Sequence, residues 1–157
     1  MKIIFRKKIC LLFSELEIFE KGLCQYFPHE DGLLIYLGIG LNDSEELSKQ
    51  FVEKIVQCRI FPDEENKMNR SIHQINGQVC VVSQFTLYAN CKKGNRPNFT
   101  EAAPAALANE LYNYSIDCFK SHGISTTCGQ FGANMQIRSE NDGPVTIFLD
   151  SDHCLSK

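Results

Sequence analysis

The stretch Val79-Cys80-Val81-Val82-Ser83-Gln84-Phe85-Thr86-Leu87-Tyr88 begins as an unbroken apolar run and then changes to small polar residues. An apolar run with turn residues at its borders is typical of a well-buried strand. Gly32 to Ile39 is a second run of the same kind. We therefore expect two well-buried strands, over residues 32–39 and 79–88.

Two helices are expected beside these strands. The first begins near Asp43-Ser44, with two glutamates in its first turn, where the helix dipole favours negative charge. Its apolar stripe, at spacings of three and four residues, consists of Leu47, Phe51, Val52, Ile55 and Val56. The second helix follows Thr100, has Pro104 in its first turn and ends near Gly123. Its apolar positions are Leu107, Leu111, Tyr114 and Cys118.

The rest of the chain is expected to form further strands. Met135 to Ile137 and Val145 to Leu149 are expected as a late pair, separated by the loop around Asn141-Asp142-Gly143. Residues 1–31 alternate irregularly, which indicates one or two strands. These elements predict a mixed α/β fold, with antiparallel or mixed sheets curled into a sandwich or barrel and the two helices covering one side. Since the chain has no internal repeat and no linker, residues 1–157 are expected to form a single domain.

The composition argues against several classes of protein. With 43% apolar and 22% charged residues, the 157-residue chain resembles an ordinary soluble globular domain. Its net charge of −3 argues against a protein that coats nucleic acid through a bulk positive field, although Arg6-Lys7-Lys8 and Lys92-Lys93 with Arg96 are local basic patches. The apolar stretch at residues 9–13 is too short for a signal peptide, and no segment approaches the length of a membrane span.

The eight cysteines are expected to be free thiols. No two of them have the Cys-x-x-Cys spacing of a zinc or redox site, and a chain of this length does not depend on disulfides for its stability. Cys58, Cys80 and Cys118 lie in apolar periodic segments, where a thiol acts as a small apolar group. We therefore expect a reduced, cytoplasmic protein without a metal or another cofactor.

Common catalytic motifs are missing from the chain. It has no Gly-x-Ser-x-Gly motif, and its four histidines are scattered. An enzyme built from this chain would therefore rely on positioning, on backbone donors and on the substrate's own groups. By pattern alone, the polar groups of Ser83, Gln84 and Thr86 either pair with neighbouring strands or line a site. Gly143-Pro144 is, by the same reasoning, either a turn that feeds a strand or part of a site.

Five segments together resemble the D-aminoacyl-tRNA deacylases. They follow the family's order over about residues 54 to 150 of this chain. The segments are Ser83-Gln84-Phe85-Thr86-Leu87, Gly143-Pro144-Val145-Thr146, Arg59-Ile60-Phe61-Pro62-Asp63 through Lys67-Met68-Asn69, Lys93-Gly94-Asn95-Arg96-Pro97 with Phe99, and Phe131-Gly132-Ala133 with Met135. The resemblance implies a homodimeric hydrolase that cleaves the ester between a D-amino acid and the 3′ end of tRNA, without a cofactor.

The resemblance also implies how the enzyme would select its substrate. The bond between Gly143 and Pro144 would be cis, and this loop would reach from one subunit into the other's active site. Its carbonyl groups would hold the substrate's α-amino group and leave no room for the side chain of an L-amino acid. Because glycine has no side chain to exclude, glycyl-tRNA, including glycine mischarged on tRNA-Ala, would also be hydrolysed.

Further roles follow from the same resemblance. Ser83, Gln84, Phe85 and Thr86 would line the pocket around the ester, with backbone N–H groups near Phe85 and Thr86 as candidates for holding the oxyanion. A lone threonine without a base is poorly activated, so the terminal 2′-hydroxyl of the tRNA would help to activate water. Phe131 would pack against the terminal adenine, and Met135 would bind substrate. The residues expected to contact tRNA phosphates are Lys92, Lys93 and Arg96.

The N-terminal part and two other functions leave alternatives open. The residues before Gly32 match the family poorly, and either Arg6 or Lys7 could hold the glycine–proline loop. One alternative function is a DNA-binding module of the replication-origin-associated branch of this fold, which usually carries a longer basic tail than residues 151–157. The other is a generic esterase, which would hydrolyse simple esters without any dependence on the tRNA 2′-hydroxyl.

Overall fold

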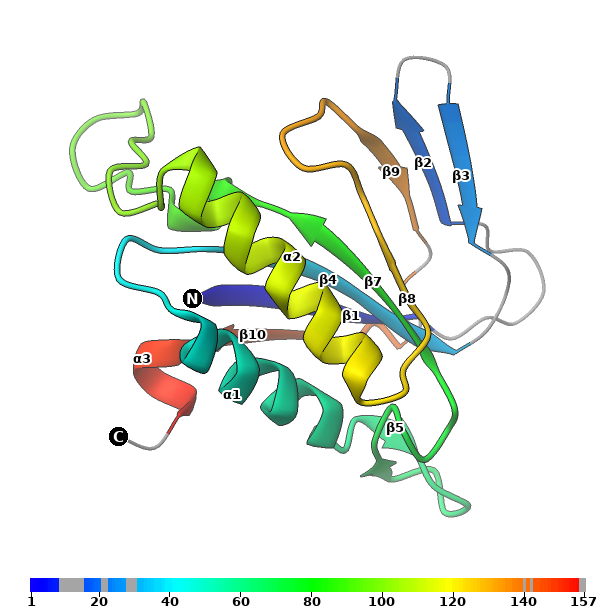
Figure 1. Ribbon diagram of the computed structural model, residues 1–157. Helices are drawn as coiled ribbons and strands as arrows, with labels where there is room; N and C mark the ends of the chain where they lie inside the picture. Colours follow the sequence, from blue (N-terminus) through cyan, green and yellow to red (C-terminus); the bar gives the residue numbers. More distant parts are fainter. Residues whose placement is uncertain (9–15, 21–22, 28–30, 140, 142, 156–157) are drawn as a thin grey trace.

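A five-stranded mixed sheet forms the centre of the molecule (Figure 1). The computed structural model describes residues 1–8, 16–20, 23–27, 31–139, 141 and 143–155, with residues 2–8, 16–20 and 23–27 described through their backbone. The order of the sheet is β10 (Thr146–Asp150), β1 (Lys2–Lys8), β4 (Gly32–Gly38), β7 (Gln78–Ser83) and β8 (Thr126–Cys128). β1 is antiparallel to both β10 and β4, whereas β4, β7 and β8 run parallel.

Two helices, α1 (Glu45–Gln57) and α2 (Ala105–Ser121), cover one face of this sheet (Figure 1). α1 begins where the sequence predicts, because the Ser44 side chain accepts a hydrogen bond from the Leu47 N–H and caps the helix. α2 is followed by Gly123, whose φ of 75° is one that glycine adopts without steric cost. The main core lies between these helices and alternate residues of β4, which are Leu33, Ile35 and Leu37.

The buried stripe is as expected in α1 and different in α2. In α1, Phe51, Val52, Ile55 and Val56 are buried and Leu47 is half-buried. In α2 the buried residues are Leu111, Tyr112, Ser115, Ile116 and Phe119. The expected positions Leu107, Tyr114 and Cys118 are only half-buried. The core face of α2 is therefore rotated from the one that the apolar pattern predicts, with a tyrosine near its centre.

A smaller sheet lies on the opposite side of β4 and β7. Its order is β3 (Leu23–Phe27), β2 (Leu16–Glu20) and β9 (Gln136–Arg138). Ile137 of β9 and the preceding Met135 pack against the side chains of β4 and β7 that point away from the helices, which are Leu34, Cys80 and Val82. The remaining elements are a 3-10 turn η1 (Phe85–Tyr88), the hairpin β5 (Phe61–Pro62) and β6 (Met68–Arg70), and a short helix α3 (Ser151–Cys154).

Three expectations about the strands are wrong. The strand expected over residues 79–88 ends at Ser83, and η1 follows it. The late strands do not pair with each other, because β9 pairs with β2 and β10 pairs with β1. Residues 1–31 contribute the three strands β1, β2 and β3, rather than one or two. The errors concern where a strand ends, which segment it pairs with and how many strands the N-terminal residues form.

The mixed α/β class with two covering helices is confirmed. Closure into a sandwich or barrel is not observed, because β10 and β8 are open edges of the main sheet in the described part of the chain. Within the same part, no helix is both long enough and apolar enough to cross a membrane. The cysteine side chains that are described form no disulfide bond, and no group of three or more His, Cys, Asp or Glu residues among those described is placed to hold a metal ion.

Candidate active site

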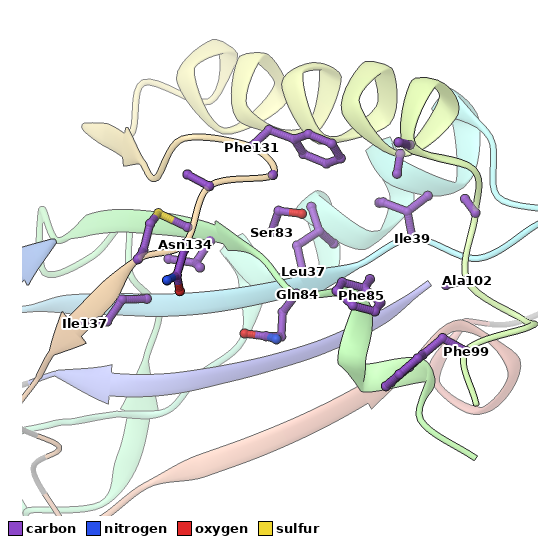
Figure 2. A pocket seen from close by; sticks show the side chains of 17 residues that line it. Leu37, Ile39, Ser83, Gln84, Phe85, Phe99, Ala102, Phe131, Asn134 and Ile137 are labelled. Carbon is purple, nitrogen blue, oxygen red and sulfur yellow. The ribbon is translucent and has the colours of Figure 1, made fainter. Parts of the chain in front are cut away.

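A cavity of about 570 Å³ lies where β7 ends, beside the start of α2. Its walls come from the ends of β4 and β7, from residues 99–108 around the start of α2, and from residues 131–137 (Figure 2). The expected site residues that line it are Ser83, Gln84, Phe85, Phe131 and Met135. None of the described side chains that line it is ionisable. The described side chains of the lining therefore offer polar groups that can form hydrogen bonds, from Ser83, Gln84 and Asn134.

The turn η1 offers two backbone donors at the edge of this cavity. The Gln84 N–H donates to the Leu37 carbonyl at 2.8 Å, which is the last such bond before the chain turns. The following bonds are from the Leu87 N–H to Gln84 O and from the Ala89 N–H to Thr86 O. Among the described residues, the N–H groups of Phe85 and Thr86 have no acceptor, as is usual at the start of a helical turn. Two adjacent N–H groups of this kind can stabilise an oxyanion.

Thr86 itself lies outside the lining of the cavity. Its side chain is exposed, and its hydroxyl accepts a hydrogen bond from Gln84 Nε2 at 2.5 Å. An amide cannot remove a proton from the hydroxyl, so this contact does not make Thr86 a nucleophile. Of the three residues expected to be catalytic, the structure thus places Ser83 and Gln84 at the cavity and Thr86 beside it.

Aromatic side chains stand on different sides of the cavity (Figure 2). Phe85 is 57% exposed, and its ring packs edge-on against Phe99, with a centroid distance of 4.9 Å and an interplanar angle of 71°. Phe131 lies on the α2 side, with its ring centroid 5.7 Å from that of Tyr112. Ser83 lies between Phe85 and Phe131 in this view. The cavity can therefore hold a flat ring against Phe131 while a polar group faces η1.

Gly143 and Pro144 do not line the cavity of their own chain. The bond between them is cis, and Gly143 has a φ of 111°, in the region that favours glycine. Across the sheet, Ser83 is level with Leu37, which is level with Ile3 and then with Leu149 of β10. The loop precedes β10, several residues along the chain from Leu149, and three strand spacings separate β10 from β7. The loop and the cavity are therefore roughly 20 Å apart within one chain.

Arg6 and Lys7 lie on β1, where the backbone of Arg6 pairs with Thr146, just after this loop, and Lys7 pairs with Leu33. Their side chains lie outside the part of the chain that is described. The choice between them as the residue that holds the loop therefore stays a prediction.

The basic residues lie in a loop that leads directly to the cavity. Lys92, Lys93 and Arg96 are all exposed. The ends of the loop are joined by two hydrogen bonds between Asn90 and Asn98, from the N–H of each to the carbonyl of the other, at 2.9 and 3.1 Å. The next residue is Phe99, which lines the cavity. The loop thus carries exposed positive charge on the segment that leads into Phe99.

Sequence reasoning missed two kinds of residue at this site. The first is a group of small residues around the start of α2, where Ala102, Ala103, Ala105 and Ala108 line the cavity and leave it wide. A run of alanines at the start of a helix was the available signal. The second is Tyr112, whose hydroxyl donates to Val81 O at 2.9 Å and lies 3.0 Å from Gly129 O. Burial raises the pKa of this hydroxyl, which keeps it protonated as a donor.

Comparison with known proteins gives consistent results. The family model described as D-Tyr-tRNA(Tyr) deacylase matches residues 27–150. A D-aminoacyl-tRNA deacylase of Thermosipho africanus (strain TCF52B) is 48% identical over 122 residues, which cover 78% of this chain and 82% of that protein. A D-aminoacyl-tRNA deacylase of Thermotoga petrophila is 48% identical over 120 residues, which cover 76% of this chain and 80% of that protein.

Two solved structures share the fold. The c-Myc DNA unwinding element binding protein superposes with a TM-score of 0.83 and 32% identity, over 96% of this chain and 98% of that one. A probable eukaryotic D-amino acid tRNA deacylase superposes with a TM-score of 0.77, over 95% of this chain and 99% of that one. At 15% identity, the second likeness concerns the fold alone.

Proposed function

Because this chain belongs to the D-Tyr-tRNA(Tyr) deacylase family, we propose that the cavity at the end of β7 is the active site of a D-aminoacyl-tRNA deacylase. The enzyme is a hydrolase that acts on ester bonds. One observation carries the assignment of the site. The two N–H groups of η1 that lack acceptors in the described chain belong to Phe85, which lines the cavity, and to the next residue, and the described lining of this cavity holds no ionisable side chain.

The reaction is the hydrolysis of the ester between the amino acid and the tRNA. Water attacks the ester carbonyl carbon, and the carbonyl oxygen becomes an oxyanion that the N–H groups of Phe85 and Thr86 hold. The bond to the 3′ oxygen of the tRNA then breaks, and this oxygen takes the proton that the water loses. The products are the free D-amino acid and the tRNA with its terminal hydroxyl restored.

The substrate itself helps to activate the water. Since the described lining offers no carboxylate, imidazole or amine, the best-placed group is the neighbouring 2′-hydroxyl of the terminal ribose. Ser83 and Gln84 then shape the pocket and orient the ester rather than move a proton. Thr86 contributes its backbone N–H, and its hydroxyl is dispensable.

Two copies of the chain form one complete site. The loop at Gly143 and Pro144 is too far from the cavity of its own chain to contact a substrate there, so it acts in the cavity of a second copy. The loop carbonyls hold the α-amino group of the D-amino acid, and the loop excludes the side chain of the L-amino acid. Glycine passes this test, so glycyl-tRNA, including glycine mischarged on tRNA-Ala, is a further substrate.

The 3′ end of the tRNA lies across the cavity mouth. The terminal adenine packs on Phe131, and Met135 lies against the bound nucleotide or amino acid. Lys92, Lys93 and Arg96 contact phosphates of the preceding nucleotides. The chain acts as one domain over residues 1–157, in the cytoplasm and without a cofactor.

Substrate assistance distinguishes this function from that of a generic esterase. The test compares hydrolysis of D-tyrosyl-tRNA with that of the same tRNA ending in 2′-deoxyadenosine, and with that of a simple phenyl ester. The proposal expects fast hydrolysis of the first, a rate lower by about 100-fold or more for the second, and negligible hydrolysis of the third. Equal rates for the two tRNAs, or efficient cleavage of the phenyl ester, would contradict it.

A second candidate function is DNA binding, which the likeness to the c-Myc DNA unwinding element binding protein favours. The resemblance covers nearly the whole of both chains. A DNA-binding module would keep its affinity for duplex DNA when the cavity is blocked. A gel-shift titration of the wild type and of Ala108→Phe with duplex DNA tests this, because the substitution fills the cavity without changing charge. Tight binding by both would favour the second function.

A further inference from the structure

Tyr88, the last residue of η1, packs against two glycines, Gly38 and Gly40. It is 8% exposed, and its ring covers Gly38 at the end of β4 and Gly40 just beyond it. A Cβ atom built on Gly40 would lie 2.5 Å from Tyr88 Oη and 3.0 Å from Cζ. A Cβ on Gly38 would lie 3.1 Å from Gln84 O, 3.2 Å from Leu87 Cβ and 3.3 Å from Tyr88 Cε2. Both glycines therefore provide space for the end of η1.

Space, and not backbone conformation, is the reason for glycine at these two positions. Neither Gly38 nor Gly40 has a positive φ, unlike Gly94, Gly123 and Gly143. An alanine could adopt the backbone of Gly40, and the contact that prevents it is with the Tyr88 ring. The backbone of Gly40 is itself fixed, because its N–H donates to Asp43 Oδ2 at 2.7 Å. The ring therefore rests on a rigid support.

The support matters because it lies at the end of η1 that is opposite to its first backbone contact with the sheet. The Gln84 N–H to Leu37 O bond holds the beginning of the turn. Phe85 and Thr86, between this bond and Tyr88, are exposed. The turn is thus anchored at its two ends, and the two N–H groups proposed to hold the oxyanion lie between the anchors.

We infer that Tyr88, seated on Gly38 and Gly40, is a positioning residue that sets where the Phe85 and Thr86 N–H groups point. This inference deepens the proposed function and rests on it for its catalytic consequence. Tyr88 does not line the cavity, so it acts only through the turn. Displacement of the turn should lower kcat, because the N–H groups would miss the oxyanion, and should change KM little.

The test pairs a substitution that displaces the ring with one that relieves the displacement. In Gly40→Ala, the new methyl group collides with Tyr88 Oη and pushes η1 outward, so kcat falls by about 10- to 100-fold. In Tyr88→Phe alone, the ring stays in place and kcat falls by about threefold or less. In the double variant, Gly40→Ala with Tyr88→Phe, the ring atom nearest to the new methyl group is Cζ instead of Oη. Adding Gly40→Ala to Tyr88→Phe therefore lowers kcat by only about threefold.

Gly77→Ala is a matched control, because it introduces a similar steric clash at a site away from η1. A Cβ on Gly77 would lie 2.7 Å from Asp31 O and 2.9 Å from Ile75 Cδ1, next to the beginning of β7 and away from η1. Gly77→Ala is expected to lower the melting temperature and to leave kcat within about twofold of the wild type. The control separates loss of stability from loss of positioning.

A second readout does not depend on activity. In amide NMR spectra, Gly40→Ala should shift the Phe85 and Thr86 resonances, and Tyr88→Phe should move them back toward their wild-type positions. Equal kcat losses from Gly40→Ala in both backgrounds, or unmoved Phe85 and Thr86 resonances, would overturn the inference. If the wild type fails to hydrolyse D-tyrosyl-tRNA, the proposed function falls, and the resonances still decide whether Tyr88 positions the turn.

Discussion

The hydroxyl of Tyr112 donates a hydrogen bond to the Val81 carbonyl at 2.9 Å and so joins α2 to the strand that ends at the candidate active site. The same hydroxyl lies 3.0 Å from the carbonyl of Gly129, which precedes the cavity segment. The Gly129 N–H also donates to Val81 O at 3.0 Å. One buried tyrosine thus holds two walls of the cavity together.

Replacing Tyr112 with phenylalanine should destabilise the protein. The substitution removes the hydroxyl that lies between the carbonyls of Val81 and Gly129, at a cost of about 1–3 kcal/mol, which corresponds to a fall in Tm of about 3–10 °C for a domain of this size. Thermal unfolding followed by circular dichroism measures the change. Tyr114→Phe, at a half-buried position of the same helix, is the control and should lower Tm less. Equal Tm values for the wild type and Tyr112→Phe would contradict the role of Tyr112.

The sequence predicts α1 well and the site only in part. The start and stripe of α1 depend on nearby residues, such as Ser44 and Phe51, so a local pattern is sufficient. In α2, Tyr112 is in the core because partners far along the chain accept its hydrogen bond, and no local pattern reports them. The polar residues after Val82 suit a strand end and a 3-10 turn equally well. In the structure β7 ends at Ser83, and the 3-10 turn follows with Tyr88 packed on Gly38 and Gly40, which lie far from it in the chain.

The pairing of strands that lie far apart in the chain also could not be predicted from the sequence. β9 and β10 are close in the chain, which suggests a hairpin, yet each pairs with an N-terminal strand. Pairing of this kind depends on which strands can bury each other's apolar faces. The apolar pattern of residues 1–31 is too irregular to show which strands these are. The resemblance to a family, in contrast, identified residues that line the cavity, because it depends on motifs and not on periodicity.

Thr86→Ala should keep most of the activity. The proposed contribution of Thr86 is its N–H, which alanine retains, and its hydroxyl is bonded to an amide that cannot act as a base. Single-turnover hydrolysis of D-tyrosyl-tRNA is expected to fall by about tenfold or less, whereas loss of a true nucleophile would cost about 1,000-fold or more. Thr100→Ala, another exposed threonine, is the control. A loss of the larger size would mean that Thr86 attacks the ester.

Removing the charges of Lys92, Lys93 and Arg96 should weaken tRNA binding in a way that depends on salt. Each phosphate contact to a single strand contributes about 0.7 to the slope of log KM against log salt concentration, so the triple alanine variant should reduce the slope by about 2. Measurement of KM for D-tyrosyl-tRNA at several salt concentrations gives the slope. Lys49→Ala on the exposed face of α1 should leave it unchanged. An unaltered slope in the triple variant would mean that this loop does not contact phosphates.

Pro144→Ala should relax the exclusion of L-amino acids more than it slows D-hydrolysis. The loop is proposed to exclude the L side chain by its position, and a more adaptable residue lets it move aside. The ratio of D- to L-tyrosyl-tRNA hydrolysis should fall by about tenfold or more, with the D rate within about threefold of the wild type. Pro62→Ala, in the hairpin of β5 and β6, is the matched control. A D/L ratio equal to that of the wild type would remove the loop from the account of selectivity.

In the proposed function, the cavity hydrolyses D-aminoacyl-tRNA and rejects L-aminoacyl-tRNA, which differs from it at the Cα of the amino acid alone. The most direct test measures kcat/KM of the wild-type protein for D-tyrosyl-tRNA and for L-tyrosyl-tRNA, prepared on the same tRNA and assayed side by side. The account predicts a preference for the D substrate of about 100-fold or more, because exclusion of a side chain by a rigid loop discriminates strongly. Comparable values for the two substrates would contradict it.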